Sequence, residues 1–253
     1  MEQRFTLPVN GTAVPCVFES CADPRRLVLS VHGLGGSSED PIQAAINEEM
    51  CCFGGAVLRF DLPAHGRHPS SELALPDCRA TLLAAAAEAR RRCPEIETLC
   101  IFATGFGAYL TLICLPELLA SGPARLVIQT PSILMHQTLL AMTRLSRETF
   151  RAMDRYTFPS PRPLTVTYKL YEQLTQAIAM DTYDAPILIL QGETDRYISR
   201  DTIENFHRIN EDSRLVIIPG TSHRFLESGA WDMVLDLTRD WFTTGQVTLT
   251  DWF

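Results

Sequence analysis

The stretch ETLCIFATGFGAYLTLIC, residues 97–114, has the pattern of a buried strand, a tight turn and a helix. We expect the strand over residues 98–103 and the helix over residues 107–120. Between them, the turn ATGFG contains two glycines, and Gly105 stands at its centre. In an open α/β sheet, ligands bind at the carboxyl ends of the strands, which is where this turn lies.

Strands and helices alternate along most of the chain. The dipeptide Asn10-Gly11 separates residues 4–9 and 12–19, which predicts an antiparallel hairpin at the start. The alternation predicts an α/β fold, with a mostly parallel central sheet and helices on both of its faces. Further strands are predicted within 25–33, 54–66, 124–132, 185–195 and 213–223, and further helices within 42–52, 75–94, 200–210 and 229–242, after which 243–253 trail from the last helix.

One segment interrupts this rhythm. Residues 132–183 contain no strong strand pattern and are rich in Met, Arg, Tyr and Pro. Their position after a strand predicts an insertion at the ligand-binding edge of the sheet. We therefore expect a core domain formed by residues 1–131 and 184–253, with a small lid formed by residues 132–183.

Composition argues against several classes of partner. The formal net charge of the 253 residues is −8, whereas nucleic-acid binding depends on clustered Lys and Arg. The chain has no apolar run of about 20 residues and no basic N-terminal segment followed by an apolar one, so we expect a cytoplasmic protein without a membrane partner. Its eight cysteines form no CxxC pairs, which predicts free thiols and no metal. No cofactor is implied, and the sequence leaves the oligomeric state open.

Two glycine-rich turns carry candidate groups for binding a developing negative charge. HGLGG, residues 32–36, follows a predicted strand, and its glycines free the backbone to point its amides inward. The N–H groups of Leu34 and Phe106 are the predicted oxyanion donors. His32 is assigned to the shape of its loop, and the hydroxyl of Thr104 is expected to point away from the turn at Gly105.

Two further loops carry a candidate acid and base. Asp195 follows one apolar strand, and His223 follows the next. Each residue has a simpler interpretation, as a turn residue or a surface histidine. Because both loops follow strands, we favour a functional pair.

The chain resembles the α/β-hydrolases of the serine-esterase and acyl-hydrolase type. VHGLGGS, DLPAHGRH, FATGFGAY, LQGETD and PGTSH match that family's pattern in its order, over nearly the whole sequence. The resemblance implies a catalytic triad with the nucleophile at position 105, Asp195 as the orienting acid and His223 as the base. The segment FPSPRPLTVTYKLYEQL is similar to the inserted subdomain of bacterial cinnamoyl and feruloyl esterases. A small ester or acyl substrate, with a hydrophobic or aromatic acyl group, is the corresponding expectation.

The departure from this family is Gly105, which stands where the family has its serine. A glycine has no hydroxyl with which to attack a carbonyl. Three interpretations follow: a serine hydrolase inactivated by an introduced or natural replacement, a lyase or other enzyme that uses His223 and Asp195 as a base, or a ligand-binding protein that has lost catalysis. A glycine adopts positive φ without strain, so the replacement is expected to leave the fold intact.

Overall fold

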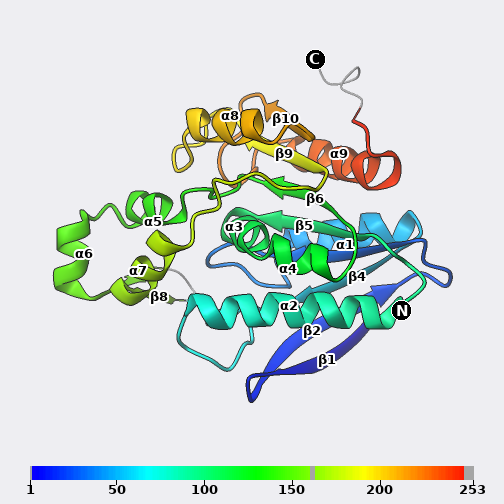
Figure 1. Cartoon of the computed structure of the whole chain (residues 1–253), viewed down its shortest axis with the longest axis horizontal. Coiled ribbons are helices and arrows are strands. Elements are labelled where there is room, and N and C mark those ends of the chain that lie inside the picture. Colours follow the sequence, from blue (N-terminus) through cyan, green and yellow to red (C-terminus); the bar gives the residue numbers. More distant parts are fainter. Residues whose placement is uncertain (1, 160–162, 248–253) are drawn as a thin grey trace.

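An eight-stranded sheet forms the centre of the molecule (Figure 1). The computed structural model describes residues 2–159 and 163–247. All neighbouring strands are parallel except at the β1 edge, where β1–β2 and β2–β4 are antiparallel, which confirms the predicted mostly parallel sheet and its opening hairpin. In spatial order the strands are β1 (Glu2–Val9), β2 (Thr12–Ser20), β4 (Gly55–Phe60), β3 (Arg26–Val31), β5 (Leu99–Thr104), β6 (Ala124–Gln129), β9 (Ile187–Gly192) and β10 (Ser213–Ile218).

Helices cover both faces of the sheet, and the alternation of side chains along each strand explains why both are apolar. In β5, Ile101 packs in one buried cluster and Phe102 in the other. Successive strand residues point to opposite faces, so a strand buried on both sides is apolar throughout. One face packs against α1 (Pro41–Cys52) and α9 (Ala230–Thr244), and the other against α2 (Leu75–Arg92), α3 (Gly105–Ile113), α4 (Leu115–Ala120) and α8 (Arg200–Ile209).

The single helix predicted over residues 107–120 is wrong. The structure has α3 and α4 instead, with Cys114 at their junction. Pro116 follows immediately, and proline has no N–H to donate to the carbonyl four residues earlier. The first of the two helices also begins at Gly105 rather than at residue 107, so position 105 is the N-terminal residue of α3.

Residues 132–183 contain short elements beyond the carboxyl end of β6, at the left of Figure 1. Although the sequence shows no strong strand pattern here, two four-residue strands pair antiparallel. Their brevity explains why the sequence pattern missed them. The segment is fixed to the core where Gln173 accepts a hydrogen bond from the Leu75 amide (3.0 Å) and where Tyr109 donates to the Ala177 carbonyl (2.7 Å). Its elements are α5 (Met135–Thr143), α6 (Arg147–Met153), β7 (Arg155–Phe158), β8 (Leu164–Thr167) and α7 (Tyr168–Gln176).

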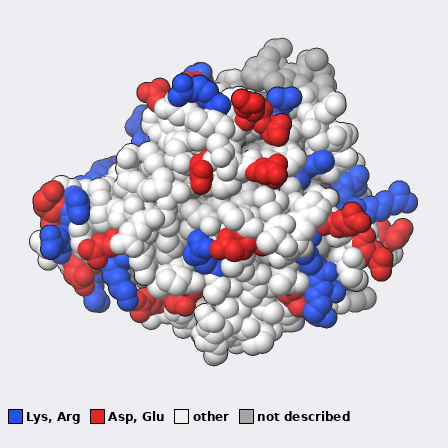
Figure 2. Space-filling view, viewed as in Figure 1, with Lys and Arg blue, Asp and Glu red and all other residues white. Residues whose placement is uncertain are grey.

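The last helix ends two residues later than predicted, at Thr244. Most of the trailing segment predicted after it, residues 248–253, lies outside the described residues. None of the helices within the described ranges combines the length and apolar character needed to cross a bilayer. On the face in Figure 2, acidic and basic side chains are interspersed around a broad uncharged area.

The turn between β5 and α3 passes very close to the end of β3. A Cβ added at Gly107 would stand 2.4 Å from the His32 carbonyl oxygen and 2.8 Å from that of Val31. Both neighbours are backbone atoms, so neither can move aside without shifting a strand end. This approach fixes the position of the whole turn against the first glycine-rich loop.

We expect Gly107→Ala to lower the free energy of unfolding by about 3 kcal/mol, because overpacking against backbone outweighs the better helix propensity of alanine. The matched control is Gly220→Ala, at φ 64° with no atom within 4 Å of the new Cβ. That control should cost about 1 kcal/mol, from its backbone conformation alone. Urea unfolding of the two variants measures both losses. A loss at position 107 no larger than that of the control would contradict the close approach.

Candidate active site

Position 105 lies at the junction of β5 and α3. Gly105 has φ 48°, and, apart from its chain neighbours and the backbone of its own helix, no heavy atom lies within 4 Å of the place where a Cβ would stand. There is therefore open space above this residue. The preceding residue, Thr104, faces the HGLGG loop. A Cβ added at Gly33 of that loop would be 3.3 Å from the Thr104 carbonyl oxygen and 3.3 Å from its hydroxyl oxygen. The Thr104 side chain thus lies beside the HGLGG loop.

Asp195 and His223, 28 residues apart in the sequence, are brought into direct contact. Nδ1 of His223 and Oδ2 of Asp195 are 2.8 Å apart. A carboxylate only accepts hydrogen bonds, so Nδ1–H donates, and Nε2 is left with its lone pair. The Asp195 side chain is 1% exposed and the imidazole 19%. The buried carboxylate thus orients the more accessible imidazole.

The carboxylate of Asp195 is held by more than its histidine. Its Oδ1 accepts from the amides of Tyr197 (2.8 Å) and Ile198 (3.2 Å), and its Oδ2 accepts from Nε2 of Gln191 (3.1 Å). Burial opposes ionisation, but the hydrogen bonds from His223 and from the Tyr197 and Ile198 amides outweigh it, so the pKa of Asp195 lies below its ordinary value of 3.8. Sequence reasoning missed Gln191, whose signal is a polar residue near the end of an otherwise apolar strand.

The loops after β9 and β10 are held together by their backbones. The Thr194 amide donates to the Thr221 carbonyl at 2.9 Å. A Cβ at Gly192 would come within 2.5 Å of that same carbonyl oxygen, so the approach requires glycine. This contact sets the spacing between Asp195 and His223.

The loop after β6 connects the two halves of the site. The Ser132 amide donates to the Gly105 carbonyl at 3.3 Å, and the Thr130 hydroxyl makes a long contact of 3.5 Å to the His223 carbonyl. Position 105 and the His223–Asp195 pair are therefore joined through one loop. Sequence reasoning missed Thr130 and Ser132, because no motif marks them.

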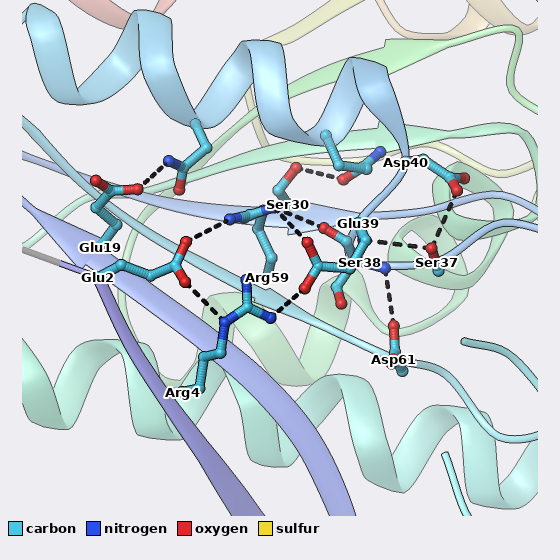
Figure 3. A network of polar contacts seen from close by, with 12 residues as sticks. Glu2, Arg4, Glu19, Ser30, Ser37, Ser38, Glu39, Asp40, Arg59 and Asp61 are labelled. Atoms are coloured by element: carbon cyan, nitrogen blue, oxygen red, sulfur yellow. Dashed lines mark hydrogen bonds and ion pairs between the residues drawn. The ribbon is translucent and has the colours of Figure 1, made fainter. Parts of the chain in front are cut away.

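A network of polar contacts fixes the first glycine-rich loop where it continues toward α1 (Figure 3). Oδ1 of Asp61 accepts from the Ser38 amide at 2.8 Å, and buried Arg59 donates to the Ser38 carbonyl at 2.8 Å. The Ser37 hydroxyl donates to Asp40 at 3.0 Å. The backbone of Ser38 is thus held through both its N–H and its C=O, which limits how far residues 32–36 can move.

The two predicted oxyanion donors occupy these fixed turns. Leu34 lies in the first loop, and its amide makes no hydrogen bond to another residue in the described ranges. Phe106 is the second residue of α3, so its N–H belongs to the first helical turn, whose amides have no intrahelical partner. Both amides are therefore available to a ligand.

His32 and His65 serve the loop structure as neutral side chains. Nδ1–H of His32 donates to the Gly33 carbonyl (2.9 Å), and its Nε2 accepts from the Leu62 amide (3.0 Å). Burial lowers the pKa of His32. Burial and the neighbouring His32 lower the pKa of His65 to about 3, with its Nδ1 2.7 Å from the Pro63 carbonyl. Both histidines are therefore uncharged near neutral pH.

No group of three or more His, Cys, Asp or Glu side chains in the described ranges is arranged to hold a metal ion. Surface hollows of about 240 and 540 Å³ lie beside β1, β4 and the start of α1. Their linings, within the same described ranges, include neither Gly105 nor the His223–Asp195 pair. Gly105, Asp195 and His223 thus follow the carboxyl ends of β5, β9 and β10, away from these hollows.

Comparisons with known proteins agree with this architecture. The model of the alpha/beta hydrolase family matches residues 28–237. Among curated protein sequences, none is significantly similar to this chain.

Similar solved structures include a protein from Agrobacterium vitis S4 named as a hydrolase (TM-score 0.82, 16% identity, covering 94% of this chain and 98% of that one). Est1E from Butyrivibrio proteoclasticus, with ferulic acid bound, has a TM-score of 0.80 at 17% identity and covers 94% and 97%. A soluble variant of monoglyceride lipase from Saccharomyces cerevisiae has a TM-score of 0.74 at 17% identity and covers 97% and 96%. At these identities the likeness establishes the fold.

The neutral state of His65 predicts a pH dependence of stability. Between its ordinary pKa of 6.5 and its folded value of about 3, the unfolded chain binds a proton that the folded chain does not. The contribution is fully present above pH 6.5 and is lost as pH falls toward 3, by up to about 1.4 kcal/mol per pH unit. We expect His65→Asn, whose amide can keep the bond to Pro63, to show a correspondingly shallower decline.

Urea unfolding across this pH range measures both slopes. The same measurement at about pH 8, where the imidazole is neutral in both states, gives the cost of the substitution itself. Parallel slopes for the two proteins would rule out a neutral buried His65.

Proposed function

The chain belongs to the α/β-hydrolase family, and from this premise we propose that its site is built for acyl transfer from an ester or similar carbonyl substrate, with Gly105 at the nucleophile's position. His223 acts as general base and then as general acid, and Asp195 holds the imidazole in its reactive tautomer. The amides of Leu34 and Phe106 bind the oxyanion.

One observation carries this proposal: the 2.8 Å contact between Nδ1 of His223 and the buried carboxylate of Asp195. A carboxylate that stays ionised against burial stabilises the imidazolium formed when Nε2 takes a proton. The contact to Gly105 through Ser132 and the open space above Gly105 support the same arrangement, because a nucleophile there would have room to act.

As it stands, the protein lacks the hydroxyl for covalent catalysis. Loss of a triad nucleophile typically lowers kcat about 10⁶-fold, while oxyanion binding alone leaves about 10³-fold catalysis over water. Position 105 has φ 48°, a conformation that costs a non-glycine residue about 1–3 kcal/mol. Glycine is therefore favourable for stability and unfavourable for ester hydrolysis.

We assign residues 132–183 to a lid that lies at the ligand-binding edge and selects the acyl group. The segment is rich in Leu, Met, Phe and Tyr, a composition that suits a hydrophobic or aromatic acyl chain. Solved structures of this fold include Est1E with ferulic acid bound and a monoglyceride lipase of Saccharomyces cerevisiae with a substrate analogue.

A second candidate function is a reaction in which the His223–Asp195 pair acts directly as general base on water or on a substrate proton. The observation that favours it is the intact pair beside a position that has no nucleophile. Such a reaction would depend on His223 whether residue 105 is glycine or serine.

We expect Gly105→Ser to raise the hydrolysis of p-nitrophenyl and cinnamoyl esters by about 10³- to 10⁶-fold, because the introduced hydroxyl meets an oriented base and two oxyanion donors. Initial rates of ester cleavage by the two proteins measure this gain. Esters with an aryl or a longer acyl group should be cleaved with a higher kcat/KM than acetate esters.

The control is His223→Ala in both backgrounds. It should abolish the gain in ester hydrolysis of the serine variant. In the Gly105 protein, a reaction that uses His223 as general base would be lost in this variant, whereas simple ligand binding involves no turnover to lose. A folded Gly105→Ser protein with no His223-dependent ester hydrolysis would refute the acyl-transfer proposal.

A further inference from the structure

Tyr197 contacts the imidazole of His223 directly. The two ring centroids are 5.2 Å apart and the ring planes are inclined at 79°, which is an edge-to-face arrangement. The amide of the same tyrosine donates to Oδ1 of Asp195 at 2.8 Å. One residue therefore contacts both members of the pair, the acid through its backbone and the base through its side chain.

Burial does not explain the place of this ring. Tyr197 is 43% exposed, so its side chain adds little to the core. Its hydroxyl has no hydrogen-bond partner among the residues that the structure describes. Within the same residues, the edge-to-face contact is the one aromatic, ionic or hydrogen-bonded interaction that the tyrosine side chain makes. What the ring does is therefore to be sought at the imidazole.

Glycine at position 105 leaves that imidazole with few restraints. In a serine hydrolase, the nucleophile's hydroxyl hydrogen-bonds Nε2 of the histidine base. Here Nδ1 of His223 is held by Asp195 at 2.8 Å, and Nε2 has no hydrogen-bond partner in the described ranges. One hydrogen bond tolerates a range of angles, so the ring could still tilt. An aromatic ring packed perpendicular to the imidazole opposes that motion.

We propose that Tyr197 is a positioning residue, whose ring keeps the imidazole of His223 in the orientation set by Asp195. It supplies the second restraint that a nucleophile's hydroxyl would give at Nε2. The inference rests on the proposed function for the role of His223 as base, but the restraint itself is measured in the Gly105 protein without any turnover. One aromatic pair changes an equilibrium by about 2- to 10-fold, which sets the size of the effect.

Proton NMR of the Gly105 protein measures the restraint. The Nδ1–H that an imidazole donates to a carboxylate gives a low-field resonance, and His223→Ala assigns it by removing it. We expect Tyr197→Ala to speed the exchange of this proton with water by about 2- to 10-fold, because the bond to Asp195 opens more often. Tyr197→Phe keeps the ring and should leave the exchange rate within about 2-fold of the parent value.

The Gly105→Ser background gives a second readout. There the introduced hydroxyl also restrains Nε2, so Tyr197→Ala should speed proton exchange less than it does in the Gly105 protein. For p-nitrophenyl esters it should lower kcat by about 2- to 5-fold and leave KM within about 2-fold. Tyr197→Phe should keep the kcat of the tyrosine protein.

Phe53→Ala is the matched control. Phe53 is 47% exposed, and its ring centroid lies 4.9 Å from the guanidinium carbon of Arg239. It precedes β4, at the amino edge of the sheet, so its loss removes a similarly exposed ring far from the pair. Proton exchange and kcat should both be unchanged. Urea unfolding of the two alanine variants separates a loss of stability from a loss of restraint.

The proposal is overturned if Tyr197→Ala leaves proton exchange unchanged in the Gly105 protein, or if Tyr197→Phe acts like alanine. It is also overturned if the parent shows no low-field resonance, because an ordered imidazole is its premise. A raised KM with kcat unchanged would overturn it too, since Tyr197 would then be a substrate contact. Failure of the proposed function looks different: the Gly105→Ser protein would not cleave esters, while proton exchange in the Gly105 protein still depended on the tyrosine ring.

Discussion

The close crossing of the β5–α3 turn over the end of β3 is the constraint on which the site depends. With 2.4 Å between a Cβ at Gly107 and the His32 carbonyl, the two loops have one possible spacing. Gly192 imposes a similar limit where the β9 loop meets the carbonyl of Thr221. These contacts are steric and involve backbone, so they hold whatever side chain occupies position 105. The geometry of the site is therefore a property of the sheet and its turns, and the nucleophile contributes nothing to it.

This separation explains how a glycine at the centre of the elbow is compatible with an ordered site. The elbow requires positive φ, which strains a serine and suits a glycine. Stability and covalent catalysis thus make opposite demands on residue 105. The amides of Leu34 and Phe106 and the His223–Asp195 pair can keep their places with glycine at position 105, because none of them depends on a side chain there for its position.

Much of this could be predicted from the sequence because the decisive signals are local. Apolar runs followed by HGLGG, ATGFG, LQGETD and PGTSH specify strand ends, and the carboxyl ends of parallel strands meet at one edge. Asp195 and His223 were predicted in this way, and the structure places them in contact. The boundary between α3 and α4 was missed although Pro116 marks it. The roles of Gln191 and Ser132 could not be predicted, since their partners come from loops that only the folded sheet brings together.

The His223–Asp195 pair alone is weak evidence for present activity. A buried carboxylate that lost its histidine would be an uncompensated charge, which is costly, so the pair has a structural reason to persist after catalysis is lost. The open space above Gly105 is different, since it takes no part in balancing that charge. Room for a ligand at this site therefore comes from the position of the missing side chain, whereas the His223–Asp195 contact has a structural role of its own.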